Sequence, residues 1–181
     1  MIIAHDEDPS RFVEAAFNRI QRESMADVPI LNPVLRVEAI GFMRWRGRWL
    51  GVLVTPWCMN LMLLADAPAN WTSIAAHERL FYHFPAGDFA FLCGEQPELG
   101  EYHSCALYSP MAQFQDQDSA RAVASAALAA LMSAPPPGLE IKSAEGGMEP
   151  QTSTIDSLPL QPEKEMSKRE FFGKIFPRLP P

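Results

Sequence analysis

The sequence has few of the residues that build metal and redox centres. Its three cysteines, Cys58, Cys93 and Cys105, are far apart, and no two of them form a Cys-x-x-Cys pair. This spacing excludes a zinc ribbon, a rubredoxin-type iron site and a thioredoxin-type redox pair. An odd number of separated thiols is typical of a protein in a reducing compartment, so we expect a cytoplasmic location.

Phosphate-binding loops and catalytic carboxylate pairs are also missing. The chain has neither a Walker pattern nor a Gly-x-Gly-x-x-Gly loop, which excludes the usual nucleotide sites. Its close acidic pairs, such as Asp116/Asp118 and Glu163/Glu165, fall in a predicted helix cap and in a polar linker. Neither place gives two carboxylates a buried site for acid–base catalysis. We therefore predict no cofactor and no catalytic residue.

Basic charge and long apolar runs are scarce. The net charge of −7 leaves no basic face for a nucleic acid, although it is compatible with a basic partner such as an arginine-bearing peptide. No stretch reaches the roughly 18 apolar residues of a membrane-spanning helix. Residues 1–8 are acidic and lack the apolar segment of a secretory signal. We expect no nucleic-acid partner and no membrane insertion.

The chain does contain one dense apolar stretch, residues 49–64. Residues 49–56 carry no charge and are rich in Val and Leu, which predicts a buried strand. Pro56 removes a backbone donor and restricts Thr55 to an extended conformation. A second apolar run, residues 58–64, follows at once. This pattern indicates two adjacent strands of one sheet, joined at a tight Thr55-Pro56-Trp57 corner.

Turn residues and periodicity define the elements around this stretch. Asp8-Pro9-Ser10 opens an amphipathic helix that ends near Met25. Residues 35–45 are strand-like, and Arg46-Gly47 indicates a hairpin turn. Such a turn would place Trp45 and Trp49 close to each other across the hairpin.

The second half of the chain predicts an antiparallel strand pair and a helix. Residues 89–95 and 102–108 alternate as strands around a polar turn, and residues 119–132 form an alanine-rich helix capped by Asp116 or Asp118. Strands held between terminal helices favour an α+β fold with an antiparallel sheet of about five strands. We divide the chain into a flexible N-terminus (1–8), a binding domain (9–137), a disordered linker (138–165) and a basic, aromatic tail (166–181).

Two arrangements of histidine and cysteine leave an enzymatic alternative open. His77, His83 and His103 could approach a cysteine and form a metal site, although their spacing fits no standard ligand pattern. His103 and Cys105 are two residues apart on a strand, so their side chains share a face. The alternative to a binding protein is therefore a small thiol- or metal-dependent accessory enzyme that uses Cys105 and His103, with Cys93 as a further candidate.

Adaptable apolar and acidic side chains define the candidate partner surface. Methionine and aromatic residues repack around varied partners, and carboxylates pair with arginine. Unpaired sheet edges can also accept an extended peptide. On these grounds the predicted partner-binding residues are Trp57, Met59, Phe84, Glu95, Glu101 and Tyr102.

Several segments, in order, resemble the HybE/HupJ family of [NiFe]-hydrogenase assembly chaperones. They cover residues 11–135 and comprise residues 20–25, the loop 29–33, Trp49-x-Gly51-Val52-x-Val54-Thr55-Pro56-Trp57-x-Met59, Phe84-Pro85-Ala86-Gly87, Phe89-x-Phe91, Gly94-Glu95 and Tyr102-x-Ser104-Cys105-x-Leu107-x-Ser109-Pro110-Met111. The resemblance implies a cytoplasmic chaperone for an uptake [NiFe] hydrogenase. It would bind precursor subunits, including the twin-arginine signal peptide of the small subunit, and delay export until assembly is complete. The family has no established catalytic residues, so the resemblance implies none here.

The tail resembles a client rather than a chaperone. Residues 167–174 are similar to the twin-arginine pattern Ser-Arg-Arg-x-Phe-Leu-x-Lys, with Lys168 in place of the first arginine, followed by Arg169, Phe171 and Phe172. No apolar stretch follows this motif, so it should not direct export. We expect the tail to imitate a client signal and to occupy the groove of this chain or of a neighbouring copy.

Overall fold

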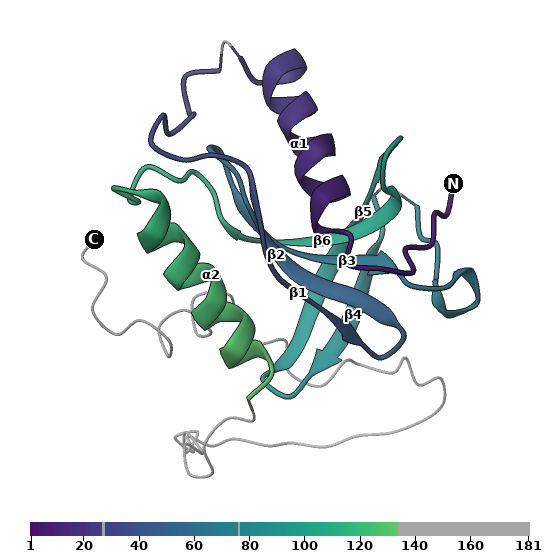
Figure 1. Cartoon of the computed structure of the whole chain (residues 1–181). Helices are drawn as coiled ribbons and strands as arrows, with labels where there is room; N and C mark the ends of the chain where they lie inside the picture. Colours follow the sequence, from purple (N-terminus) through teal and green to yellow (C-terminus); the bar gives the residue numbers. More distant parts are fainter. Residues whose placement is uncertain (27, 76, 134–181) are drawn as a thin grey trace, which may run out of the picture.

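Six antiparallel strands form one sheet with a helix on each side (Figure 1). The computed structural model describes residues 1–26, 28–75 and 77–133, so the predicted linker and tail lie outside the described residues. The α+β prediction is confirmed, with six strands instead of about five. The elements are α1 (Ser10–Ser24), β1 (Glu38–Trp45), β2 (Arg48–Val54), β3 (Met59–Ala65), the short 3-10 helix η1 (Pro68–Asn70), β4 (Arg79–Phe84), β5 (Gly87–Gln96), β6 (Gly100–Tyr108) and α2 (Gln117–Leu131).

The sheet is built from two meanders of three strands each. Its strand order is β1-β2-β3-β6-β5-β4, so β3 and β6 join the two meanders in the middle and β1 and β4 form the edges. The predicted β1–β2 hairpin is confirmed, because Arg46 and Gly47 have φ angles of 48° and 71°, as a type I′ turn requires.

The register of this hairpin separates the two tryptophans that flank it. Trp45 pairs with Arg48, and Arg44 pairs with Trp49. Paired residues share a face of the sheet, and adjacent residues of one strand point to opposite faces. The expected contact between Trp45 and Trp49 is therefore wrong, because each belongs to a different hydrophobic cluster.

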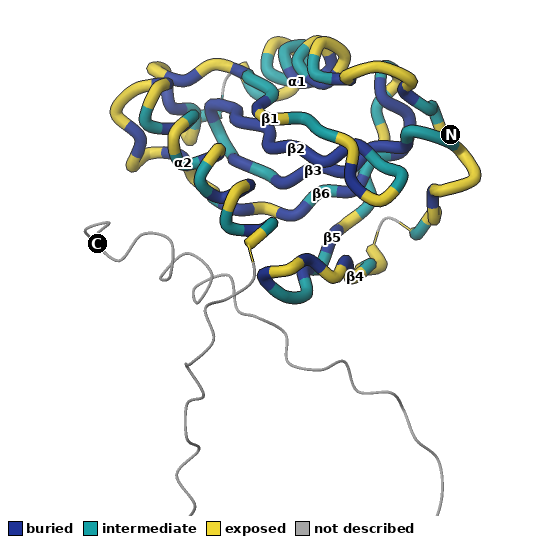
Figure 2. Tube along the Cα trace, turned by 60° about the horizontal axis from the view of Figure 1, so that its bottom comes forward, coloured by how far each residue is buried: buried dark blue, intermediate teal, exposed yellow. Residues whose placement is uncertain are grey.

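A hydrophobic cluster covers each face of the sheet. On one face Val13 and Phe17 of α1 pack against Leu53 and Met62, and on the other Leu131 and the alanines of α2 belong to the cluster around β2 and β3. Figure 2 shows that burial is concentrated in the central strands. Because β2 and β3 are buried on both faces, they read as continuous apolar runs instead of alternating ones.

The sheet curls until its two edge strands meet at one end. The Trp45 ring of β1 stacks on the Phe84 ring of β4 with centroids 4.3 Å apart. At the same end, Nη1 of Arg46 donates to the carbonyl oxygen of His83 at 3.4 Å. The face that carries α2 is thus concave, and aromatic side chains fill the curl.

Polar contacts fix α2 to the edge strand β1. Asp116 caps the helix as predicted, since its side chain accepts a hydrogen bond from the Ser119 amide at 2.6 Å. Glu38 accepts hydrogen bonds from Arg121 Nε at 2.9 Å and from Gln117 Nε2 at 2.6 Å. Burial raises the pKa of Glu38, but these hydrogen bonds outweigh it and hold the pKa below its ordinary value.

The N-terminal residues are anchored to the sheet, in contrast to the expected flexible N-terminus. The amide of His5 donates to the carbonyl of Ala65 at 3.0 Å, and the carbonyl of His5 accepts from Trp49 Nε1 at 2.7 Å. The amide of Glu101 donates to the carbonyl of Met1 at 2.8 Å. Residues 1–5 therefore give a buried indole its hydrogen-bond acceptor, which a mobile segment would leave unpaired.

Candidate functional site

Trp57 lies at the predicted corner between β2 and β3. The hydroxyl oxygen of Thr55 accepts hydrogen bonds from the amides of Cys58 and Trp57, at 2.9 and 3.3 Å, and so fixes the chain reversal. Trp57 is half-buried beside the cluster under α1. Tyr102 belongs to the same surroundings and packs edge-to-face on Phe17, with ring centroids 6.0 Å apart. Both side chains remain partly accessible to a partner.

Two of the predicted partner-binding residues lie inside the core. Met59 and Phe84 each have 0% of their surface exposed, in the cluster on the α2 face. A partner could reach them only if the core opened. We therefore leave both out of the proposed partner surface.

The two predicted acidic residues have very different surroundings. The Glu95 side chain is 59% exposed and forms an ion pair with the Met1 ammonium at 2.6 Å. Glu101 is 9% exposed and belongs to a polar cluster between β5, β6 and the segment after η1. Its carboxylate accepts from Trp71 Nε1 at 3.1 Å and from the Ser73 hydroxyl at 2.8 Å.

His103 and Cys93 complete this cluster. Cys93 pairs with His103 across β5 and β6, which places both side chains on the same face as Glu101. Cys93 Sγ, one carboxylate oxygen of Glu101 and one ring nitrogen of His103 all lie within 4.8 Å of one another. Cys93 is half-buried and His103 is fully buried, so the cluster is open to solvent on the Cys93 side.

The His103 ring is held on one side and unpaired on the other. Its Nδ1 lies 2.8 Å from the Tyr82 hydroxyl, and Trp71 stacks on the ring at 4.2 Å. Its Nε2 is 3.5 Å from Glu101 Oε1 and has no hydrogen-bond partner among the described residues. A buried ring nitrogen without a partner is uncommon in a folded protein.

Burial determines the charge states in this cluster. It lowers the pKa of His103 to about 4, despite the neighbouring Glu101 carboxylate. Burial and then the Glu101 carboxylate raise the pKa of the Cys93 thiol to about 11. Burial also raises the pKa of Glu101, but hydrogen bonds from Ser73 and Trp71 outweigh it and keep the pKa below its ordinary value. Near neutral pH the cluster thus holds a neutral imidazole, a thiol and one carboxylate.

The structure places His103 beside Cys93, the further candidate in the sequence, and beside Glu101, which the sequence assigned to the partner surface. His77 and His83 are exposed, and His83 Nδ1 contacts Asp88 Oδ1 at 2.6 Å on the opposite face from His103. Cys105 shares a face with His103 but is 2% exposed within the core, where a substrate cannot reach its thiol. Gly100, at a φ of 67°, sets the register that aligns Cys93 with His103. In the sequence, Gly100 directly follows a loop of three residues, 97–99, and this hairpin pattern is the signal that could have predicted the pairing of Cys93 with His103.

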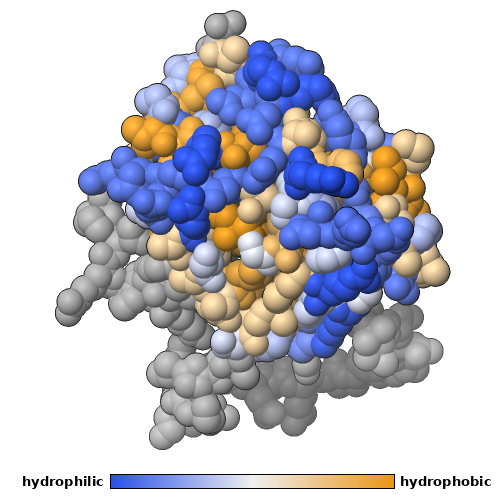
Figure 3. All heavy atoms as spheres, in the orientation of Figure 1, coloured by the Kyte–Doolittle hydropathy of each residue, from blue (hydrophilic) through white to orange (hydrophobic). Residues whose placement is uncertain are grey.

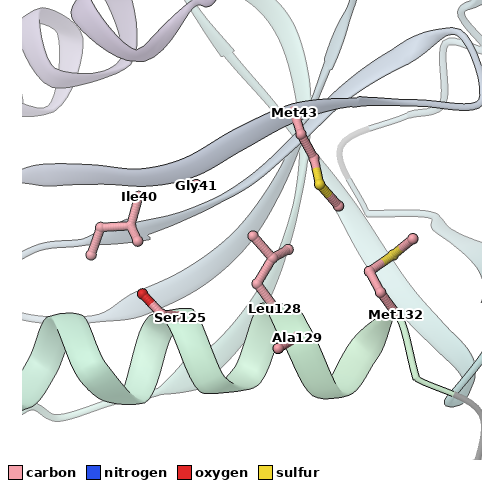
Figure 4. A pocket seen from close by; sticks show the side chains of 7 residues that line it. All are labelled: Ile40, Gly41, Met43, Ser125, Leu128, Ala129 and Met132. Carbon is pink, nitrogen blue, oxygen red and sulfur yellow. The ribbon is translucent and has the colours of Figure 1, made fainter.

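A shallow apolar cleft lies between the edge strand β1 and α2. Its volume is about 360 Å³, and it is lined by Ile40, Gly41, Met43, Ser125, Leu128, Ala129 and Met132. A strip of apolar residues runs between α2 and β1 in the space-filling view (Figure 3). In Figure 4 Met43 and Met132 border one end of the cleft, while Leu128 points from the helix towards the strand.

Comparison with known proteins decides the family. A family model described as "[NiFe]-hydrogenase assembly, chaperone, HybE" matches residues 8–174. The chain belongs to this family. The family resemblance seen in the sequence is thereby confirmed, and its span is longer than residues 11–135. The match includes the tail residues Lys168, Arg169, Phe171 and Phe172.

Individual HybE-family proteins agree in sequence and in fold. The hydrogenase expression/formation protein HupJ of Bradyrhizobium diazoefficiens is 44% identical over 141 residues, which are 78% of this chain and 79% of HupJ. The hydrogenase-2 operon protein HybE of Escherichia coli K12 is 32% identical over 103 residues, 57% of this chain and 64% of that protein. The solution structure of HybE from E. coli matches with a TM-score of 0.59 and 25% identity, covering 86% of this chain and 95% of that one.

Two further observations concern membrane-spanning helices and the class of partner of this HybE-family chain. No helix in residues 1–26, 28–75 or 77–133 is long and apolar enough to cross a membrane. The family description also indicates the broad class of partner, because a chaperone for hydrogenase assembly acts on hydrogenase subunits.

Proposed function

We propose that this protein is a cytoplasmic, non-enzymatic chaperone that binds the precursor of a hydrogenase small subunit, including its twin-arginine signal peptide. By holding the signal, the chaperone delays export until assembly is complete. Membership of the HybE family supports the general role. The apolar cleft between β1 and α2 supports the binding of an apolar client segment and is the observation on which we base the proposal.

The cleft has the properties expected of a peptide-binding groove. Its volume of about 360 Å³ is at the lower end of the range for ligand pockets, about 300–1,000 Å³, so it would hold a few apolar side chains of a client. Met43 and Met132 are unbranched and can repack around different sequences. β1 pairs only with β2 among the described strands. Apart from the Ala39 amide, which donates to Glu14 Oε1 at 3.0 Å, its outer backbone edge is left for an extended peptide.

The client's arginines require acidic or aromatic contacts outside the apolar cleft. Glu95, Trp57 and Tyr102 are the accessible members of the predicted set, and we propose that they contact the client. Glu95 would have to exchange its ion pair with the Met1 ammonium for one with a client arginine. An exposed ion pair contributes only about 0–1 kcal/mol of stability, so this exchange costs little free energy.

A peptide titration tests both parts of the proposal. A synthetic twin-arginine signal peptide is titrated into the full chain, with an arginine-to-alanine peptide as the control ligand. Ala129→Glu places a charge in the cleft, whereas Ala122→Glu makes the same change at an exposed position of α2 outside it. We expect Ala129→Glu to weaken binding at least 10-fold and Ala122→Glu to leave it within 2-fold. Equal affinities for all three proteins would refute the cleft as the binding site.

We further propose that the tail competes with the client for the same cleft. α2 ends at Leu131 and Met132 lines the cleft, so the chain continues from the cleft's border. A flexible segment of about 30 residues spans about 30 Å on average, which is enough for the tail motif to fold back. Tethering raises the effective concentration of such a motif to about the millimolar range.

Deleting residues 138–181 should increase the affinity for the signal peptide if the tail competes. A full-length chain with Lys168→Gln and Arg169→Gln should show the same increase while keeping the linker. If both proteins bind the peptide as tightly as the unmodified chain, the tail does not compete with the client.

A further inference from the structure

We propose that Cys93, Glu101 and His103 form a binding site for a divalent transition-metal ion, of the borderline class that includes Zn²⁺ and Ni²⁺. The three side chains come from adjacent positions of β5 and β6, and their ligand atoms lie within 4.8 Å of one another. A thiolate, a carboxylate and an imidazole are the ligand types that such ions take in proteins. This inference is independent of the proposed client-binding cleft.

The separation of two of the ligand atoms fits a shared ion better than a hydrogen bond. His103 Nε2 and Glu101 Oε1 are 3.5 Å apart, at the outer limit for a hydrogen bond. Two ligands at tetrahedral positions, each about 2.0–2.1 Å from Zn²⁺, are separated by about 3.4 Å. An ion between these atoms would give the buried Nε2 the partner that it otherwise lacks.

The hydrogen bonds around the cluster are those that orient metal ligands. The Tyr82 hydroxyl contacts His103 Nδ1 at 2.8 Å. When the hydroxyl oxygen accepts a hydrogen bond from Nδ1–H, Nε2 carries the lone pair, which is directed towards Glu101. Trp71 and Ser73 each donate to one oxygen of that carboxylate. Such outer contacts fix the tautomer and orientation of ligands in known metal sites.

The charges in the cluster balance when the ion is bound. The Cys93 thiol loses its proton to solvent, and the resulting thiolate with the Glu101 carboxylate offsets the two positive charges of the ion. The Arg48 guanidinium, 5.3 Å from the centroid of the Tyr82 ring, weakens cation binding electrostatically. Three protein ligands leave a fourth position for water or for a donor group of a partner.

Metal titration of the tag-free full chain tests the site. After treatment with a chelator, the chain is titrated with Co²⁺, whose bond to a thiolate produces a near-ultraviolet charge-transfer band, and then with Zn²⁺ or Ni²⁺ as competitors. We expect one equivalent to bind with this band and either competitor to displace it. Absence of the band, or of saturable binding for all three ions, would overturn the proposal.

Variants separate this cluster from other metal-binding groups. Cys93→Ser should abolish the charge-transfer band and weaken Zn²⁺ binding at least 10-fold, whereas Cys58→Ser, which changes another half-buried thiol outside the cluster, should leave both unchanged. Tyr82→Phe should weaken binding about 10-fold by loosening His103. His103 is fully buried, so its variants are interpreted only when circular dichroism shows a folded chain. Undiminished Zn²⁺ binding by Cys93→Ser would also overturn the proposal.

Discussion

Substitution of Phe84 tests how the sheet is stabilised. The sequence predicts a partner-binding role for this residue, whereas the structure gives it a role in the core. The sequence places it on a partner surface, whereas its ring is 0% exposed and stacks on Trp45 at 4.3 Å. It also contacts Phe89 edge-to-face at 5.8 Å. In the structure it holds the two edge strands of the curled sheet together.

The expected loss of stability for Phe84→Ala follows from this burial. Removing a fully buried phenylalanine side chain costs about 3–5 kcal/mol, a range that includes the cavity left behind. The stacked pair places this residue in the upper half of the range, since aromatic contacts add about 0.5–1.5 kcal/mol. We therefore expect a loss of about 4 kcal/mol, which for a domain of this size lowers Tm by about 12–20 °C.

Urea unfolding, followed by tryptophan fluorescence and circular dichroism, measures this loss. The matched control is Phe81→Ala, on the same strand but 42% exposed on the opposite face, for which we expect less than about 1 kcal/mol. The m-value should stay the same in both variants. If Phe84→Ala loses no more stability than Phe81→Ala, the reasoning is wrong and the surface role of Phe84 returns.

Three further predictions, on Glu38, Gly51 and residues 1–5, are tested by urea unfolding. Glu38→Gln should reduce stability at neutral pH, and the difference should shrink as the pH falls below about 4.3, the pKa of an unfolded glutamate. The folded pKa of Glu38 is depressed, so its contribution is present above the unfolded pKa and is lost as the pH falls through the folded pKa. A pH-independent difference would contradict this. Gly51→Ala should destabilise by about 1–3 kcal/mol, because the new Cβ would clash with the ring of Phe42. Adding Phe42→Leu should recover most of that loss, and no recovery would rule out the clash. Deleting residues 1–5 should lower stability by about 1–3 kcal/mol, because the buried Trp49 Nε1 loses its acceptor; an unchanged midpoint would show that the N-terminus is dispensable.

Local signals in the sequence predict most of the elements. The Arg46-Gly47 turn, the Thr55-Pro56-Trp57 corner and the cap at Asp116 each depend on a few neighbouring residues, and all three are present in the structure. The α+β class follows from the order of these elements. Such features need no knowledge of distant contacts, which is why a single sequence is sufficient for them.

Features set by register and curvature were not predictable in the same way. One residue of offset in the β1–β2 pairing places Trp45 and Trp49 on opposite faces. Phe84 is buried because the sheet curls over it. This curl arises from the twist of all six strands and cannot be predicted from one strand alone. Cys93 and His103 meet through the register after Gly100. Spacing along one strand pairs His103 with Cys105, so the sequence indicates Cys93 only as a further candidate.

The stack between Trp45 and Phe84 has a consequence for how the domain opens. The meanders β1–β3 and β4–β6 are each local in sequence, and the β3–β6 ladder alone joins them by strand pairing. Without a second link, either meander could fray from its outer strand independently. The aromatic stack at the rim couples the two outer strands, so we expect amides of β1 and β4 to exchange with deuterium at similar rates, as parts of one cooperative unit.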